Sequence, residues 1–229
     1  MKRIGILGGL SAESTALFYN TLTRLYIEQN GDTAYPEIVI FSVQFSHFLS
    51  LMKNENKEAC AHYLASGIQA LEKAGADFAV ISANTPHLLF DQIAQKVSIP
   101  LLHIAETVTE VAKSEGYTKV ALLGTMATMN ADFYPISLSR YDIACITPNE
   151  EQKEIVNGIL ERELYKGIVN EKSRTLYLDL IQQLKKQGAE AIILGCTEIP
   201  MLIHPGNSPL PLLDSAAILA QAALDRALQ

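Results

Sequence analysis

Short apolar runs alternate with longer amphipathic stretches along the chain. The first run, residues 3–7, ends at a glycine pair, and an amphipathic stretch follows it at residues 15–29. This order is typical of a strand, a tight turn and a helix that is capped at its N-terminus. Further strands are predicted at residues 37–43, 77–81, 119–123, 142–147 and 191–194, and further helices at 57–74, 104–114, 151–165, 173–187 and 215–228.

The strand candidates are uniformly apolar, and helical stretches separate them. Uniformly apolar strands are typical of parallel sheets that helices cover on both faces. We therefore predict an α/β fold.

An internal repeat divides the chain. Residues 73–85 align with residues 186–198 without a gap, so that Ala83 takes the place of Cys196 (196 − 83 = 113). Residues 3–9 align with 119–125 at a similar offset (119 − 3 = 116). The repeat predicts two similar halves, residues 1–115 and 116–229, with a last helix that can cross over to the first half.

The repeat also predicts where a ligand binds. Duplicated halves usually lie about a pseudo-twofold axis, and ligands of open parallel sheets bind outside the carboxyl ends of strands. The turns at Gly8, Ala83, Gly124 and Cys196 each follow a strand candidate. We expect them to form one cleft between the halves.

Charge and composition narrow the function classes. The net charge is −7, no basic cluster is present, and 48% of residues are hydrophobic. A chain of this kind offers no basic field for nucleic acid. No signal-peptide pattern and no apolar run of about 20 residues is present, so we expect a cytoplasmic protein without a membrane span.

The three cysteines are widely spaced, which argues against disulfides and clustered zinc ligands. The histidines are scattered too, so no metal site is predicted. We interpret Cys60 and Cys145 as packing residues of a helix and of an apolar strand. Cys196 instead follows a strand, in Gly-Cys-Thr-Glu, where backbone N–H groups and a helix dipole favour a thiolate. The alternative is a buried inert cysteine.

Polar residues also follow the other strand ends. Asn84 and Thr85 suit a substrate carboxylate, although they can equally form a turn that caps a helix. The glycine turns that contain Gly9 with Ser11 and Thr125 with Thr128 can hold an anion at a helix start. Neither turn is a dinucleotide fingerprint, which argues against nicotinamide use.

These motifs together resemble the aspartate/glutamate racemase family over nearly the whole chain. The glycine turn, Asn84-Thr85-Pro86-His87, Gly124-Thr125 with Thr128, Glu163-Leu164 with Gly167, Gly195-Cys196-Thr197-Glu198 and residues 211–214 carry the resemblance. It implies two pseudo-symmetric halves, a homodimer, and amino-acid racemisation without metal or pyridoxal cofactor. In that family two thiols, one from each half, act on opposite faces of the substrate α-carbon.

The resemblance also implies site residues. Asn84, Thr85, Thr125, Thr128 and Thr197 correspond to positions that hold the amino-acid carboxylate and amino group. Lys166 is our candidate partner for a side-chain carboxylate, and we assign Gly9, Ser11 and Glu198 to the substrate site as well.

The first catalytic cysteine of the family pattern is replaced here by Ala83, which cannot transfer protons. Ser82, His87 or a water is then expected to serve that face. We predict a racemase or epimerase of a small acidic amino acid, such as aspartate or glutamate, with Cys196 as acid/base. The alternatives are a single-cysteine decarboxylase or isomerase of the superfamily and an inactive carboxylate-binding paralogue.

Overall fold

A computed structural model describes all residues, 1–229. The chain forms two compact units: residues 1–104 with 219–229, and residues 105–218. The halves expected from the sequence repeat, residues 1–115 and 116–229, are defined by sequence similarity and not by compactness, and they stay a prediction. No helix has both the length and the apolar character needed to cross a membrane.

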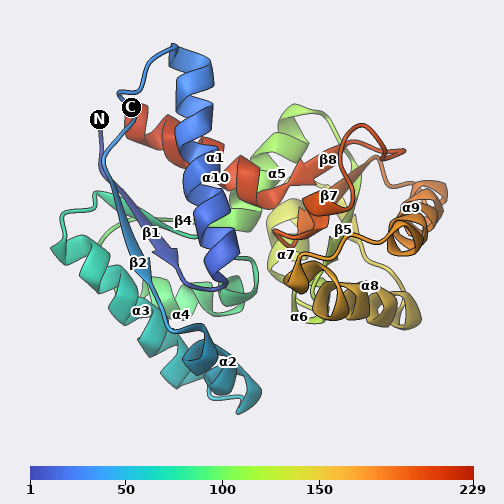
Figure 1. The fold of residues 1–229 in the computed structure, drawn as a ribbon, viewed down its shortest axis with the longest axis horizontal. Helices are drawn as coiled ribbons and strands as arrows, with labels where there is room; N and C mark the ends of the chain where they lie inside the picture. The colour runs from blue at the N-terminus through green and yellow to red at the C-terminus, as the bar shows by residue number, and fades with distance from the viewer. The chain divides into compact units, whose positions relative to one another are not determined.

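The first unit is built on a parallel sheet of four strands (Figure 1). The strands are β1 (Ile4–Gly8), β2 (Ile38–Ser42), β3 (Phe78–Ile81) and β4 (Leu101–Leu102), in the order β2-β1-β3-β4. β1 and β3 are fully buried, as expected for the central strands of a covered parallel sheet.

The helices of the first unit are α1 (Ala12–Asn30), α2 (Phe45–Lys53), α3 (Lys57–Lys73), η1 (Thr85–Leu89), α4 (Phe90–Ala94) and the end of α10 (Ser215–Leu228). Leu64 and Ile68 of α3 pack with Leu7 and Ile81 of the sheet in one buried cluster. The two ends of the chain lie side by side, because the Lys2 N–H donates to the Ala227 carbonyl at 2.8 Å.

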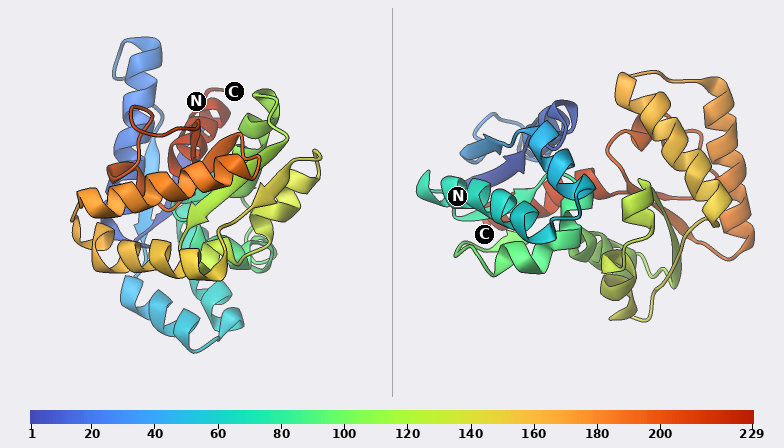
Figure 2. Two further views of the ribbon diagram at one scale, coloured as in Figure 1. Left: turned by 90° about the vertical axis from the view of Figure 1, so that its right-hand side faces the viewer. Right: turned by 90° about the horizontal axis from the view of Figure 1, so that it is seen from below.

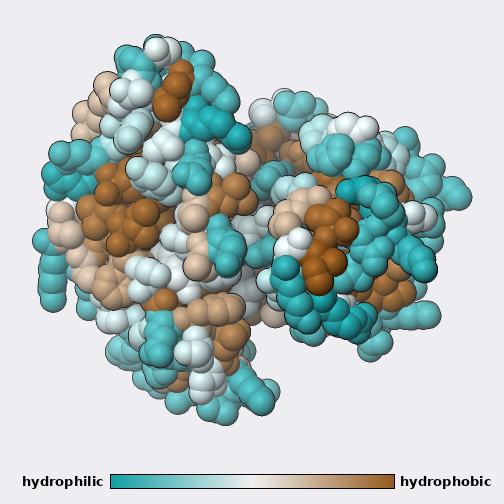
Figure 3. Space-filling model, in the orientation of Figure 1, coloured by the Kyte–Doolittle hydropathy of each residue, from teal (hydrophilic) through white to brown (hydrophobic).

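The outer strand β2 pairs only with β1 and is partly open to solvent. Ile40 and Phe41 of this strand are exposed, and Figure 3 shows apolar residues gathered over the region of β2. An exposed apolar edge strand is a surface on which another chain can pair. The homodimer implied by the resemblance stays a prediction.

The second unit repeats the sheet. Its strands are β5 (Lys119–Gly124), β6 (Ala144–Ile146), β7 (Ala191–Gly195) and β8 (Leu212–Asp214), all parallel and in the order β6-β5-β7-β8. Around it lie α5 (Ile104–Ser114), α6 (Met126–Met129), α7 (Phe133–Ser139), α8 (Glu150–Arg162), η2 (Leu164–Lys166), α9 (Glu171–Lys186), η3 (Ile199–Met201) and the start of α10. α8 and α9 lie side by side, and Gln152 donates to Gln183 at 2.7 Å between them (Figure 2).

Strand register confirms the two similar α/β halves. Leu7 of β1 pairs with Ile81 of β3, and Leu123 of β5 pairs with Leu194 of β7. The offsets, 116 (123 − 7) and 113 (194 − 81), are those of the sequence repeat. Ala83 and Cys196 therefore occupy equivalent positions, two residues beyond equivalent paired residues.

Several details differ from the sequence-based expectations. The predicted helix at 151–165 ends earlier, at Arg162, and the 3₁₀ turn η2 follows it. Cys60 is fully buried in the first unit's core, as expected. Interpreting Cys145 as a core residue was wrong: it is only partly buried, because β6 is the outer strand of its sheet.

Candidate active site

Cys196 directly follows β7 and is 8% exposed. Its thiol donates a hydrogen bond to Glu198 Oε2 at a sulfur–oxygen distance of 3.0 Å. The Thr197 hydroxyl donates to the same oxygen at 2.7 Å. Three consecutive side chains thus form one network around a buried sulfur.

The expectation that the turn after β7 favours a thiolate at Cys196 was wrong in its net effect. Burial, and after it the charge of Glu198, raises the pKa of Cys196 well above its usual value. The element that follows, η3, is a single 3₁₀ turn, too short for an appreciable dipole to stabilise an anion. The resting group is a neutral thiol, which suits a proton donor.

Tyr165, a residue that the sequence did not indicate, brings its hydroxyl to 4.0 Å from the Cys196 sulfur. It belongs to η2, in the Glu-Leu-Tyr-Lys-Gly stretch. Burial first, and then Cys196 and Glu198, raises the pKa of Tyr165. The neighbouring Lys166 is exposed, and the turn ends at Gly167 with φ 71°, in the left-handed region that favours glycine.

Thr125 and Thr128 lie at the end of the strand next to β7. Gly124 pairs with Gly195, so the turns that follow these two glycines start side by side. The Thr125 hydroxyl donates to the Thr128 hydroxyl at 3.0 Å and accepts the Thr128 N–H at 3.1 Å. An added Cβ at Gly124 would meet the Gly195 carbonyl at 2.9 Å, so glycine lets these strand ends approach closely.

The first turn of the other unit uses its polar groups within the fold. Gly9 has φ 78°, and its N–H donates to the Thr15 hydroxyl at 2.8 Å. Ser11 caps α1 by accepting the Ser14 N–H at 3.1 Å. The Gly9 amide, expected to help hold an anion, is therefore already bonded.

The turn after β3 is buried as well. The Ser82 hydroxyl donates to the Leu7 carbonyl at 3.2 Å, and Asn84 is buried where η1 begins with Thr85. His87 Nδ1 lies 2.9 Å from the Ala83 carbonyl, and the Ile104 N–H donates to Nε2 at 3.2 Å.

The environment of His87 fixes its protonation state. Burial, followed by the neighbouring His103, lowers the pKa of His87 to about 3. The ring is therefore neutral at ordinary pH: its Nδ1–H group donates to the Ala83 carbonyl, and Nε2 accepts the Ile104 N–H. Both ring nitrogens are engaged by backbone, an arrangement that orders the turn rather than moving protons.

The residues expected to act together thus fall into two sets. Cys196, Thr197, Glu198, Thr125 and Thr128 lie at neighbouring strand ends of the second unit. The first unit contains the remaining ones: Gly9, Ser11, Ser82, Ala83, Asn84, Thr85 and His87. No group of three or more His, Cys, Asp or Glu side chains is placed to hold a metal ion.

Comparison with known proteins decides the family. The model of the Asp/Glu/hydantoin racemase family matches residues 7–223. The chain belongs to this family.

Members of the racemase family resemble the chain over their whole length. The broad specificity amino-acid racemase RacX of Bacillus subtilis is 29% identical over 226 residues, 96% of this chain and 95% of that protein. A Yersinia pestis protein provisionally assigned as an Asp/Glu racemase is 37% identical, with a TM-score of 0.94 over 100% of both chains. An aspartate racemase homologue of Pyrococcus horikoshii is 36% identical, with a TM-score of 0.89 and the same coverage.

Proposed function

We propose that the protein is a cofactor-independent amino-acid racemase or epimerase in which Cys196 is the thiol acid/base. The observation that carries the proposal is the hydrogen bond between the buried Cys196 thiol and the partly exposed Glu198 carboxylate at the carboxyl end of β7. Membership of a racemase family supports the reaction class. The name of the Bacillus relative supports a tolerant substrate range.

The pair accounts for proton transfer in both directions. In one direction the Cys196 S–H bond breaks, its proton forms the new C–H bond of a substrate carbanion, and a thiolate remains. In the other direction Glu198 first takes the thiol proton, since its oxygen already accepts that hydrogen at 3.0 Å. The thiolate then removes the α-proton and becomes a thiol again, and Glu198 releases its proton to solvent. In either direction a water on the opposite face of the α-carbon accepts or supplies the second proton, because Ser82 and His87 are bonded to backbone.

Glu198 therefore acts on the thiol, a role different from the substrate contact expected from the sequence. Thr197 orients Glu198 through its hydroxyl. We propose small acidic amino acids, such as aspartate or glutamate, as substrates. Thr125, Thr128, Asn84 and Thr85 are the candidate contacts for the α-carboxylate and amino group, and the exposed Lys166 is the candidate for a side-chain carboxylate.

The test follows solvent deuterium. The protein is incubated in D₂O with a panel of L- and D-amino acids, and α-deuteration and enantiomer ratio are measured. Cys196→Ala should lower the exchange rate by about 10²–10⁴-fold, the usual contribution of a positioned acid/base group. Cys145→Ala, which removes a partly buried thiol elsewhere in the same unit, should leave the rate unchanged. Absence of α-deuterium from every substrate would refute racemisation.

A second function is favoured by one observation: the position equivalent to Cys196 is Ala83, and the nearby Ser82 and His87 are bonded to backbone. A single thiol suffices to protonate the carbanion that forms when a malonate-type acid loses CO₂. Release of CO₂ that depends on Cys196, without α-exchange of amino acids, would select this reaction. A carboxylate-binding protein without activity would give neither signal.

A further inference from the structure

The hydrogen bonds of the Cys196 sulfur identify the donor in its contact with Tyr165. A thiol carries one hydrogen, and that hydrogen goes to Glu198. The contact between the Tyr165 hydroxyl and the sulfur, 4.0 Å long, must therefore have the tyrosine as donor. The sulfur has lone pairs to accept it.

Tyr165 is suited to this role by its position. The residue is 50% exposed whereas Cys196 is 8% exposed, so the side chain reaches from solvent to the buried sulfur. Because partial burial, and after it the neighbouring Cys196 and Glu198, raises the pKa of Tyr165, its hydroxyl keeps its proton over the ordinary pH range. It can donate to the sulfur both before and after the thiol is deprotonated.

The turn that carries Tyr165 is fixed at Glu163. The Glu163 carbonyl accepts the N–H groups of Lys166 at 2.9 Å and Ile168 at 3.1 Å, which closes the turn. The Glu163 side chain accepts the hydroxyl of Ser173, a buried residue in the first turn of α9, at 2.6 Å. Ser173 thus ties the tyrosine turn to a long helix.

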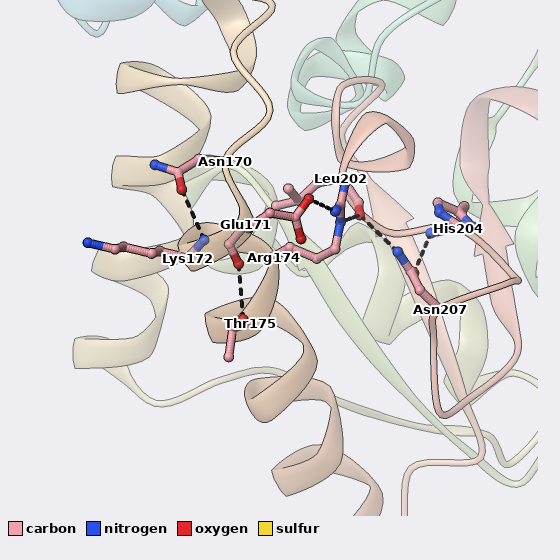
Figure 4. A network of polar contacts seen from close by, with 8 residues as sticks. All are labelled: Asn170, Glu171, Lys172, Arg174, Thr175, Leu202, His204 and Asn207. Carbon is pink, nitrogen blue, oxygen red and sulfur yellow. Dashed lines mark hydrogen bonds and ion pairs between the residues drawn. The ribbon is translucent and has the colours of Figure 1, made fainter.

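The next residue of α9 holds the segment that follows the cysteine. Arg174 Nε donates to the Leu202 carbonyl at 2.9 Å and pairs with Glu171, while Asn207 Nδ2 donates to the same carbonyl at 3.3 Å (Figure 4). Ser173 and Arg174 therefore hold the two segments whose side chains meet at the sulfur.

We propose that Tyr165 is a further catalytic residue: its hydroxyl donates a hydrogen bond to the Cys196 thiolate that forms during proton transfer, and Ser173 and Arg174 are positioning residues that hold it there. The inference rests on the proposed function, in which Cys196 alternates between thiol and thiolate. Without the tyrosine hydroxyl, the thiolate beside Glu198 would lose a donor that offsets the adjacent negative charge.

The test measures thiolate formation directly, without substrate. The rate at which a neutral pyridyl disulfide reacts with Cys196 is measured from pH 7 to pH 10.5, and the modified peptide is identified by mass spectrometry. Tyr165→Phe should move the profile to higher pH and slow the reaction about threefold to tenfold at pH 8, because a charge-assisted hydrogen bond to the anion is lost. Tyr141→Phe is the matched control, since it removes an exposed hydroxyl bonded to Glu110.

The positioning residue Ser173 is tested with the same profile. Ser173→Ala should move the pH profile in the same direction by a smaller amount. Ser137 is equally buried and its hydroxyl is bonded to that of Thr109 at 2.8 Å, and Ser137→Ala should leave the profile unchanged. An unchanged profile in Tyr165→Phe, or one moved to lower pH, overturns the inference. Because no substrate is present, this result does not depend on whether the protein racemises amino acids. If racemisation is observed, kcat of Tyr165→Phe should fall by a larger factor than KM rises.

Discussion

Replacing Glu198 by glutamine separates the two effects that the carboxylate has on Cys196. The negative charge disfavours the thiolate, and it is one cause of the raised pKa of Cys196. The same carboxylate is the proposed acceptor of the thiol proton. Glu198→Gln should therefore make Cys196 more reactive towards disulfides and at the same time make the protein a poorer racemase.

The structure sets the size of the first effect. Two unit charges at the 3.0 Å sulfur–oxygen distance repel by about 5.5 kcal/mol at an effective dielectric constant of about 20, and by about 1.4 kcal/mol at the value of water. Glu198 is partly exposed, so the effect lies between these limits, and removing the charge lowers the pKa of Cys196. Thiol nucleophilicity falls as the pKa falls, which leaves a rate increase of roughly 3- to 150-fold.

The assay is the reaction of Cys196 with a neutral pyridyl disulfide at pH 8, together with α-deuteration of amino acids in D₂O. Glu151→Gln, which removes an exposed carboxylate from the first turn of α8, is the control and should alter neither rate. We expect α-deuteration to fall by about 10²-fold in Glu198→Gln, as for loss of a positioned acid/base group. A slower disulfide reaction, or unchanged α-deuteration, would refute the proposed pairing.

Two further predictions concern the first unit. The pKa of His87 is about 3 in the folded protein and near 6.5 in the unfolded chain. As the pH falls below 6.5 the unfolded chain therefore binds a proton that the folded protein does not, and the folded state loses stability. Between pH 7 and pH 4 wild type should lose about 3 kcal/mol more free energy of unfolding than His87→Gln, measured by urea denaturation. Ala83→Cys should raise α-deuteration by about tenfold or more, since it places a thiol at the position equivalent to Cys196 (196 − 83 = 113); a rate equal to that of wild type would contradict this.

The sheets and the cysteine position could be predicted from the sequence because each depends on local pattern. Runs of four or more apolar residues bounded by turn residues predict strands. The gapless repeat then shows which positions of the two halves are equivalent. β4 and β8 were missed because each is a run of two or three residues directly after a proline, whereas the equally short β6 lies within the longer apolar stretch 143–146. Their existence depends on pairing with β3 and β7, a non-local interaction that the residues themselves do not encode.

The direction of side chains could not be predicted. The substrate contact expected of Glu198 stays a prediction, and the hydrogen bond of its carboxylate to the sulfur two residues earlier was not indicated by the sequence. Tyr165 was not recognised because 31 residues separate it from Cys196 and because the helix before it ends at Arg162. Helix length alone would have placed Tyr165 on the surface of α8, away from any strand end.

The two repeats have kept the same backbone while their polar groups serve different ends. After β3, Ser82 and His87 bond to backbone carbonyl and amide groups, so their hydrogen-bonding capacity stabilises the turn itself. After β7, the side chains of Cys196 and Glu198 bond to each other, and a proton can move between them without disrupting the backbone. In the turn after β3, Asn84 and Thr85 follow Ala83 at the positions that Thr197 and Glu198 take after Cys196. The hydrogen bond between a thiol and a carboxylate, on which the proposed proton transfer depends, is therefore found in the second repeat and has no counterpart at Ala83 and Thr85.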